Sequence, residues 1–256
     1  MKKYDVVIVG AGIAGMTAAI YICRAGKSVL VLEERVQGGQ IINTINIENW
    51  PGDFKVSGAE LSQKIYKQME ELGAEVEFDK VTKISRDKGE FVIECEDEDY
   101  RALAVVIASG TEPRRLSERQ TLDVGNRPIS YCATCDGALY KDKIVVVVGH
   151  GNSAKHEVKY LENIASKVYQ IHHDEPIPED AEAVFVAIGR VPNTSFLKDF
   201  VELDGDGYVV ASEDCKTSML GVFVAGDCRV KDVRQLVTAA SDGAVAASAA
   251  VEYLNK

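Results

Sequence analysis

Cys132 and Cys135 lie two residues apart in the stretch SYCATCDG, in a chain of 256 residues that has only six cysteines. This spacing suits a metal half-site, a structural bridge or a redox-active pair. A zinc site needs four ligands, commonly a second C-x-x-C or paired histidines. The remaining cysteines are isolated, and His172 and His173 are adjacent, so they do not easily share one ion. A dithiol–disulfide pair fits better, because two intervening residues close the small ring used in thiol exchange.

We therefore predict a redox centre and no metal site. Asp136 follows Cys135 directly, and a carboxylate there could move protons to or from a departing thiolate. Six cysteines are too few for a disulfide scaffold in a chain of this length. Cys228 is a different case, because it has no cysteine neighbour and a free cysteine most often behaves as a small buried hydrophobe.

The N-terminal segment has the pattern of a nucleotide-binding unit. Residues 4–9, YDVVIV, form an apolar run typical of a buried parallel strand. Gly10, Gly12 and Gly15 follow as G-x-G-x-x-G, and a predicted helix runs from there to Ala25. In this pattern the first glycine permits a tight turn, the second admits a pyrophosphate and the third allows close packing of helix and strand. Glu33 ends the next predicted strand, where a carboxylate accepts hydrogen bonds from a ribose.

A second pair of signals lies near the C-terminus. The stretch LGVFVAGD, residues 220–227, predicts a buried strand broken by Gly226 and Asp227. Asp227 is either a capping residue or a contact to another part of a bound nucleotide. The following segment predicts a helix whose apolar stripe contains Val237, Ala240, Ala244, Ala247, Val251 and Leu254.

These motifs, in this order, resemble bacterial thioredoxin reductases of the low-molecular-weight type over nearly the whole chain. The resemblance rests on GAGIAG, VLVLEERVQGGQI and IENWPG in the first third, SYCATCDG in the middle and GVFVAGDCRVKDVRQLVTAASDGAVAA at the end. It implies an α/β, two-domain, Rossmann-like flavoprotein whose FAD-binding domain is built from both chain ends. The expected bounds are 1–112 and 192–256 for that domain, and 113–191 for an inserted, truncated pyridine-nucleotide-like domain carrying the C-x-x-C.

The same resemblance implies roles for individual residues. Cys135 would face the flavin, Cys132 would attack the substrate disulfide of thioredoxin, and Asp136 would be the acid. FAD would be bound by residues from both chain ends: Gly10, Gly12, Ile13, Ala14, Gly15, Glu33, Gln40, Asn49, Val81, Asp227, Arg234, Gln235 and Leu236.

The middle of the chain departs from the family pattern. A second glycine turn, Gly149-His150-Gly151, lies between predicted strands at 144–148 and 167–171, but only 38 residues separate Gly151 from Gly189. A complete doubly wound domain needs roughly 100 or more residues. We therefore expect that about half of the unit, including its crevice wall, is missing, and that the surviving glycines serve packing alone.

The charges after the second of these strands point the same way. Relatives that use NADPH have an arginine-rich stretch there, whereas this chain has HHDEPIPED, which would repel a 2′-phosphate. The pattern resembles ferredoxin-dependent flavin thioredoxin reductases, which implies electron transfer from ferredoxin through FAD to thioredoxin, and a homodimer. An NADH-dependent reductase and a flavoprotein redox sensor without turnover remain as alternatives.

Composition limits the partners. The formal net charge of −11 and the lack of a Lys/Arg-rich face argue against nucleic acid. The Ala-rich run 244–251 is too short and too interrupted to span a bilayer. The chain opens Met1-Lys2-Lys3 and enters the first predicted strand with no apolar signal region, so we expect a cytoplasmic protein.

Overall fold

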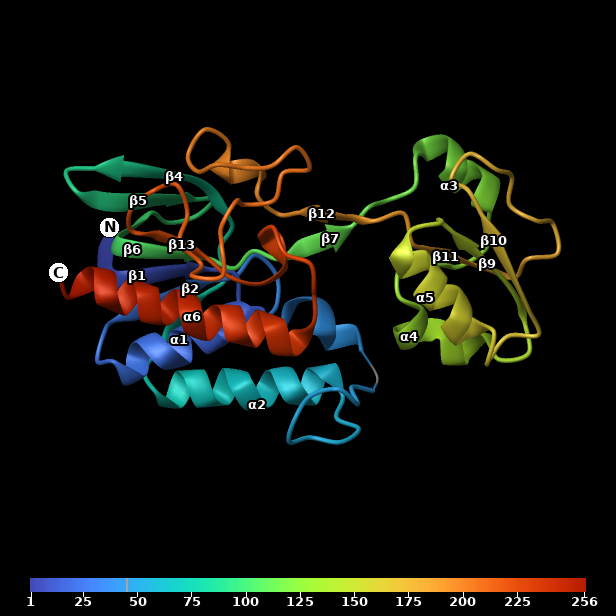
Figure 1. Cartoon of the computed structure of the whole chain (residues 1–256), viewed down its shortest axis with the longest axis horizontal. Helices are drawn as coiled ribbons and strands as arrows, with labels where there is room; N and C mark the ends of the chain where they lie inside the picture. Colours follow the sequence, from blue (N-terminus) through green and yellow to red (C-terminus); the bar gives the residue numbers. More distant parts are fainter. Residues whose placement is uncertain (45) are drawn as a thin grey trace. The chain divides into compact units, whose positions relative to one another are not determined.

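The two ends of the chain fold into one unit, and its middle forms another. A computed structural model describes residues 1–44 and 46–256, apart from the side chains of Asn43, Thr134, Cys135 and Asn152. Unit 1 comprises Met1–Thr111 with Pro192–Lys256, and unit 2 comprises Glu112–Val191. Figure 1 shows the blue N-terminal and red C-terminal segments together in unit 1. The division fits an α/β flavoprotein fold with one domain inserted into another.

Unit 1 is built on a seven-stranded sheet in the order β3-β2-β1-β6-β5-β4, with β13 also pairing with β6. The parallel part consists of β1, β2, β3, β6 and β13, while β4 and β5 join it antiparallel. The strands are β1 (Lys2–Val9), β2 (Val29–Leu32), β3 (Glu75–Glu77), β4 (Val81–Asp87), β5 (Glu90–Cys95), β6 (Tyr100–Ile107) and β13 (Val222–Val224).

Helices cover one face of this sheet. They are α1 (Ile13–Arg24), α2 (Gly58–Glu71) and α6 (Leu236–Leu254), with short 3-10 turns η1 (Gly39–Asn43), η3 (Ser195–Leu197) and η4 (Gly226–Cys228). Figure 1 shows the three helices side by side below the strands. The apolar core on their side joins β1 and β2 to α1 and α6, and a second core on the other face includes Phe91, Ile107, Leu197 and Val201.

The buried face of α6 differs from the predicted stripe. The residues that it buries are Asp242, Gly243, Ala246, Ala247 and Ala250, so Ala247 is the one position shared with the prediction. Val237 is 45% exposed. The reason is the close approach of α6 to α1: a Cβ on Gly243 would overlap the carbonyl oxygen of Ala14. The helix therefore turns its smallest side chains toward α1, and not its largest apolar ones.

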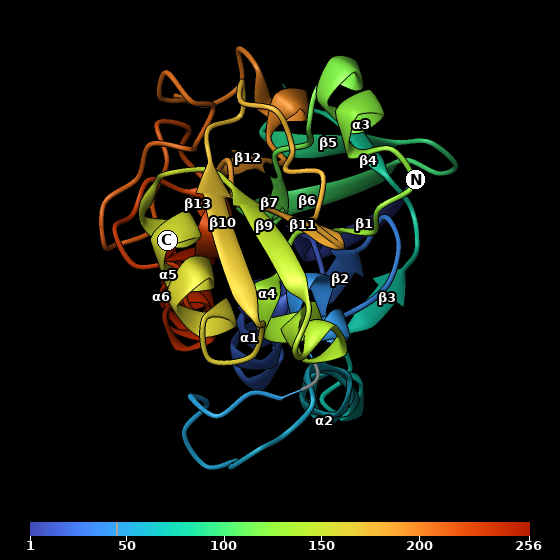
Figure 2. The same cartoon turned by 90° about the vertical axis from the view of Figure 1, so that its right-hand side faces the viewer.

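Unit 2 has a four-stranded parallel sheet in the order β10-β9-β11-β8. Its strands are β8 (Ile129–Ser130), β9 (Ile144–Val148), β10 (Lys167–Ile171) and β11 (Ala183–Val186), and its helices are α3 (Glu118–Val124), α4 (Ala133–Asp136), η2 (Gly137–Tyr140) and α5 (Asn152–Leu161). Figure 2 shows β9 and β10 side by side, with α4 and α5 nearby. The bounds predicted for β9 and β10 are confirmed.

The two connecting segments between the units pair with each other. They are β7 (Thr111–Pro113) and β12 (Arg190–Pro192), which form a two-stranded sheet. In the part of the chain that the structure describes, no helix is long and apolar enough to cross a membrane. The same residues contain no group of three or more His, Cys, Asp or Glu side chains that could hold a metal ion.

Candidate functional site

The first glycine turn has the geometry of a phosphate cradle. Gly10 has a φ of +105°, its N–H donates to the Leu32 carbonyl at 2.7 Å, and a Cβ there would overlap the Ala108 carbonyl oxygen. A Cβ on Gly15 would overlap the carbonyl oxygen of Gly10. Gly12, the N-cap of α1, differs: a Cβ there would meet no heavy atom within 4 Å among the described residues. Packing therefore requires the outer two glycines, and open space lies beside the middle one.

Glu33 stands directly after β2 and faces this turn. Its Oε2 accepts the backbone N–H of Ala11 at 2.8 Å, and its Oε1 accepts that of Arg35 at 3.1 Å. These bonds fix the carboxylate at the carboxyl end of the parallel strands, where nucleotides bind in open α/β sheets. Ile13 and Ala14, the other predicted contacts in the turn, form the start of α1 and are buried.

The remaining predicted FAD contacts come from four places in unit 1. Asn49 and Gln235, 186 residues apart in sequence, are joined by a hydrogen bond of 3.1 Å from the Asn49 Nδ2. The Nε of Arg234 donates to the Asp227 carbonyl at 3.4 Å. Gln40 donates from its Nε2 to the carbonyl and hydroxyl oxygens of Thr111, both at 3.0 Å. Leu236 begins α6, whereas Val81 begins β4 and is buried in the core of the other sheet face.

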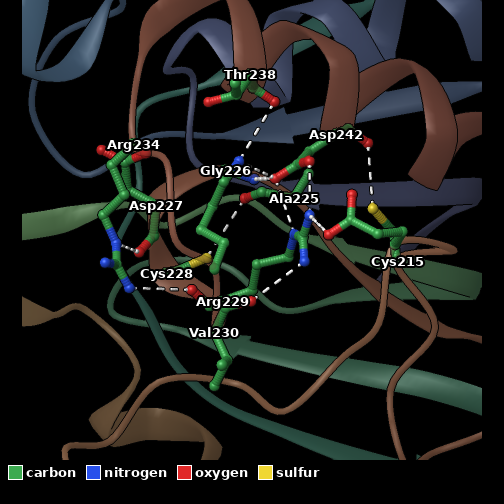
Figure 3. Close-up of polar contacts among 12 residues, drawn as sticks. Cys215, Ala225, Gly226, Asp227, Cys228, Arg229, Val230, Arg234, Thr238 and Asp242 are labelled. Carbon is green, nitrogen blue, oxygen red and sulfur yellow. Dashed lines mark hydrogen bonds and ion pairs between the residues drawn. The ribbon is translucent and has the colours of Figure 1, made fainter.

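A buried ion cluster supports the turn that carries Asp227 (Figure 3). Arg229, 2% exposed, donates to both oxygens of Asp242, from Nε at 2.9 Å and from Nη2 at 3.0 Å. Lys231 and the N–H of Gly226 donate to the Asp242 Oδ2 at 2.7 and 3.0 Å. Burial alone would raise the Asp242 pKa, but the hydrogen bonds from Arg229 and Lys231 outweigh it and hold that pKa below its usual range.

No pattern in the sequence indicated this cluster. Asp242 lies in the run SDGAVA, which has the composition of an exposed helical turn, and its partners precede it by 11 and 13 residues. Its carboxylate fixes the Gly226 N–H, so it positions the backbone turn from which Asp227 extends. The cluster is therefore a support for the predicted flavin contact at Asp227 rather than a contact itself.

The isolated cysteines are inert thiols. Burial raises the pKa of Cys228 to about 11 and that of Cys215 to about 12, and both side chains are fully buried. Burial also raises the thiol pKa of Cys95 to about 12 and that of Cys23 above its usual range. Because the thiolate is the reactive form, these four free cysteines are poor nucleophiles at neutral pH. Cys228 thus has the surroundings of a buried hydrophobe.

The C-x-x-C motif follows β8, one of the two edge strands of the sheet in unit 2. Cys132 is disulfide-bonded and is the N-cap of α4, while the side chain of Cys135 lies outside the described residues. Ser130, 5% exposed, donates its hydroxyl hydrogen to the Asp136 Oδ2 at 2.7 Å and accepts the Cys132 N–H at 3.1 Å. This serine therefore ties the predicted acid to the backbone of the predicted nucleophile, a link that the sequence did not suggest.

The second glycine turn repeats the first within unit 2. The Gly149 N–H donates to the Ile171 carbonyl at 2.8 Å, and a Cβ on Gly149 would overlap the Ala187 carbonyl oxygen. Gly151 is the N-cap of α5, and a Cβ on it would meet no heavy atom within 4 Å among the described residues. Packing therefore requires a glycine at position 149 and does not require one at position 151. That these glycines serve packing alone stays a prediction.

The wall of the crevice at this turn was expected to be missing, and the structure has an open hollow there, which the sequence did not predict. A pocket of about 360 Å³ opens at the carboxyl ends of β9, β10 and β11. The residues that line it are Gly149, His150, Gly151, Ser153, His172, His173, Ala187, Ile188 and Gly189. The hollow persists because three adjacent parallel strands and the N-terminus of α5 are retained. It contains three of the four histidines of the chain and no arginine or lysine among its lining residues.

Comparison with known proteins gives a consistent result. The family model described as pyridine nucleotide-disulphide oxidoreductase matches residues 4–179 and 174–244. The thioredoxin reductase of Bacillus subtilis is 34% identical over 303 aligned positions, which cover 100% of this chain and 96% of that protein. The chain belongs to the thioredoxin reductase family.

Two solved structures illustrate the range of relatives. Thioredoxin reductase from Lactococcus lactis is 32% identical with a TM-score of 0.85, and the match covers 98% of this chain and 99% of that one. A ferredoxin-flavin thioredoxin reductase from Clostridium acetobutylicum is 29% identical with a TM-score of 0.64, covering 100% of this chain and 99% of that one. The expected α/β flavoprotein fold is thus confirmed.

Thioredoxin reductases of this family use FAD, and unit 1 fits it. The open space beside Gly12 is where a pyrophosphate approaches the backbone in such turns, and the N-terminus of α1 offers N–H groups with a positive dipole end. Glu33, the predicted ribose contact, is fixed at this turn by the N–H of Ala11. The chain is therefore a flavin-dependent disulfide reductase by family.

Proposed function

We propose that the chain carries electrons from reduced ferredoxin through FAD and a Cys132–Cys135 disulfide to thioredoxin, in a homodimer. Bound FAD would accept single electrons and deliver them as a pair. Three residues of the chain have separate roles: Cys132 attacks the thioredoxin disulfide, Cys135 closes the internal disulfide, and Asp136 transfers a proton to the departing thiolate. The bond from Ser130 supports this assignment, since it keeps the Asp136 carboxylate at a fixed place beside the Cys132 backbone.

The lining of the second pocket is the observation that carries the choice of donor. NADPH carries a 2′-phosphate, which proteins bind with arginine side chains. The described residues that line the pocket include no arginine, and its wall after β10 consists of His172 and His173, with Glu175 accepting the His172 N–H at 2.6 Å. A carboxylate at that position opposes a phosphate. NADPH is therefore a poor match for this pocket. A protein donor such as ferredoxin would not need the pocket at all.

The length of the chain and the few elements that follow α5 also support ferredoxin as the donor. The alignment with the Bacillus subtilis enzyme has 303 positions for a chain of 256 residues, so 47 of them carry no residue of this chain. Only β10, β11 and the segment between them remain after α5 to build the rest of a pyridine-nucleotide site. The pocket is correspondingly open, and it lacks the further helices and strands that would enclose a dinucleotide.

A protein donor needs a docking surface of suitable charge. Ferredoxins are usually acidic, and unit 2 exposes Arg114, Arg115, Arg119 and Lys141. Two further basic residues near the C-x-x-C motif in sequence are already engaged within unit 2. Arg127 donates to the carbonyl oxygens of residues 124, 179 and 181, and Lys143 pairs with Glu182 at 3.6 Å. The proposed docking surface therefore consists of the four exposed residues.

NADH is the second candidate donor, and the open space at Gly151 is the observation that favours it. A glycine not required by packing beside a helix N-terminus is what a pyrophosphate needs. NADH lacks the 2′-phosphate, so the absence of arginine does not count against it.

Anaerobic stopped-flow reduction of the bound flavin separates these donors. Reduced ferredoxin should bleach the flavin and support thioredoxin reduction, at a rate that falls as salt rises because the docking is electrostatic. NADPH should fail, and His173→Arg with Asp174→Arg should gain weak NADPH binding without flavin reduction. Millisecond bleaching by micromolar NADPH would refute the assignment of ferredoxin, and bleaching by NADH alone would favour the second candidate.

A further inference from the structure

We propose that Glu157 acts on the Cys132–Cys135 pair by proton uptake. Its carboxylate takes up one of the two protons that accompany reduction of the disulfide. This inference rests on the proposed redox role of the pair. Two electrons from the flavin, or from a dithiol in solution, break the S–S bond. One proton then goes to one cysteine sulfur and the other to Glu157, and the second sulfur remains a thiolate.

Glu157 lies on α5, which packs against the short helix α4 that starts immediately after Cys132. The backbone N–H of Ala133, the residue between Cys132 and Thr134, faces its carboxyl group and favours the charged form. Its Oε2 is fully buried and has no hydrogen-bond partner among the described residues. The carboxyl group therefore has one oxygen directed at the backbone of the disulfide motif and one oxygen free to carry a proton.

The surroundings of Glu157 contain little to balance its charge. Among the described residues, Arg190 of β12 is the charged side chain whose field acts on it. The core beneath α5 is apolar, with Ala133, Val145, Val147 and Phe185 from α4, β9 and β11. Because Glu157 is half-buried above this apolar core, a negative charge formed on Cys132 during reduction would be only partly screened at Glu157.

Burial of the carboxyl group raises the pKa of Glu157 to about 7, and the Ala133 N–H and Arg190 lower it less than burial raises it. This value belongs to the form in which Cys132 is disulfide-bonded. A new thiolate nearby disfavours the carboxylate, so reduction raises the Glu157 pKa further. Between the two pKa values, Glu157 is ionised in the oxidised protein and protonated in the reduced one. Reduction thus takes up an additional proton above about pH 7, and none at Glu157 below it.

The test is the pH dependence of the dithiol equilibrium in the FAD-loaded protein. Wild type and Glu157→Gln are equilibrated anaerobically with dithiothreitol redox buffers from about pH 6 to about pH 9. After acid quenching and alkylation, mass spectrometry of the Cys132–Cys135 peptide gives the reduced fraction. Above about pH 7, the equilibrium constant of the wild type should change about tenfold more per pH unit than that of Glu157→Gln. Below it, the two profiles should run parallel.

Glu162→Gln is the matched control, since it removes the same charge from an exposed position at the end of α5. Its profile should follow the wild type. Parallel profiles of wild type and Glu157→Gln over the whole range would overturn the inference. A pair that takes no electrons from any buffer would instead refute the proposed function.

A measurement on the wild type alone keeps the inference testable if Glu157→Gln does not fold. Reduction at about pH 8 should create the C=O band of a protonated carboxyl group in the infrared difference spectrum, because Glu157 is then expected to gain a proton. A spectrum without this band would overturn the proposal.

Discussion

The two glycine turns of the molecule share a backbone and differ in the side chains around it. The N–H groups of Gly10 and Gly149 each donate to the last carbonyl of the neighbouring parallel strand, at 2.7 and 2.8 Å. A Cβ on either glycine would overlap a carbonyl oxygen. Gly12 and Gly151 are both extended N-caps facing open space. The backbone of a nucleotide-binding turn is thus present twice.

The two turns differ in the residue that follows the neighbouring parallel strand, which is β2 in unit 1 and β10 in unit 2. In unit 1 it is Glu33, whose carboxylate accepts the N–H of Ala11 within the turn. In unit 2 it is His172, whose ring stacks on that of His150, the residue equivalent to Ala11, with centroids 3.7 Å apart and planes 5° from parallel. The carboxylate of Glu33, predicted to accept from a ribose, is thus replaced in unit 2 by a pair of stacked imidazole rings. The fold of a βαβ unit therefore survives a change in what the unit can bind, and function has to be assigned from the side chains.

The largest effect should come from the ion cluster that supports the flavin side of unit 1. Asp242→Asn leaves the buried charge of Lys231 without its carboxylate and leaves Arg229 with the exposed Glu213 alone, and breaking such a buried pair costs about 3–5 kcal/mol. Denaturant unfolding should show this loss, and flavin should be released at lower denaturant concentration. Asp232→Asn, at an exposed position of the same loop, should change neither.

The same cluster predicts a pH dependence. The pKa of Asp242 is lower in the folded chain than its usual value, so its contribution to stability is present above the unfolded pKa and is lost as pH falls through the folded pKa. Wild type should therefore lose stability more steeply than Asp242→Asn in that acidic range. Equal slopes for the two proteins would contradict the assignment of the charge.

The next largest effect should separate the two turns directly. Gly12→Val places a branched side chain in the open space proposed for the pyrophosphate, and should weaken FAD binding about 100-fold or more, about 3 kcal/mol. Gly151→Val makes the same change in unit 2 and should leave the flavin bound, because both sites have room for a Cβ. Flavin absorbance after gel filtration gives the result. A Gly12→Val protein that stays fully yellow would refute the site in unit 1.

A smaller effect should follow from the acid after β2. Glu33→Gln removes the charge from a carboxylate that also fixes the turn through Ala11, and hydrogen bonds to charged groups contribute about 1.5–3 kcal/mol. Fluorescence titration with FAD should show a correspondingly weaker affinity. Glu34→Gln, exposed at the next position, should retain the wild-type value. Equal losses in both variants would show that overall charge matters and not the position of Glu33.

Local pattern predicted the backbone of both turns. Glycine spacing and apolar runs are properties of a few consecutive residues, so β9, β10 and the start of α1 could be located from the sequence. The stripe of α6 could not, because the close approach of α1 selects small residues over larger apolar ones. A periodicity argument assumes that the largest apolar side chains are buried, and that assumption fails where two helices touch through glycine.

The supporting polar residues were not predictable for a related reason. Ser130, Glu157 and Asp242 are ordinary polar residues in sequence, and each acquires its role from a partner on another segment or from burial. The pocket at the second turn was missed because a count of residues between Gly151 and Gly189 measures chain length. It does not show that the remaining strands still leave a hollow at their carboxyl ends.

The smallest effect should come from an attempt to convert the second turn into the first. His172→Glu puts a carboxylate at the position equivalent to Glu33 and removes the stacking partner of His150. The backbone of the turn already matches, so this acid should accept the His150 N–H and offer an oxygen to a ribose. A single hydrogen bond adds about 1.4 kcal/mol at most, so NADH affinity should rise by no more than about tenfold.

NADPH should gain nothing, because a second carboxylate beside Glu175 opposes its phosphate. Calorimetric titration of both nucleotides measures these changes, with His173→Glu as the control one residue further on. A rise in NADH affinity far beyond tenfold, or flavin reduction by NADH, would mean that the second turn lacks only its acid and that the shortened unit still closes on a dinucleotide.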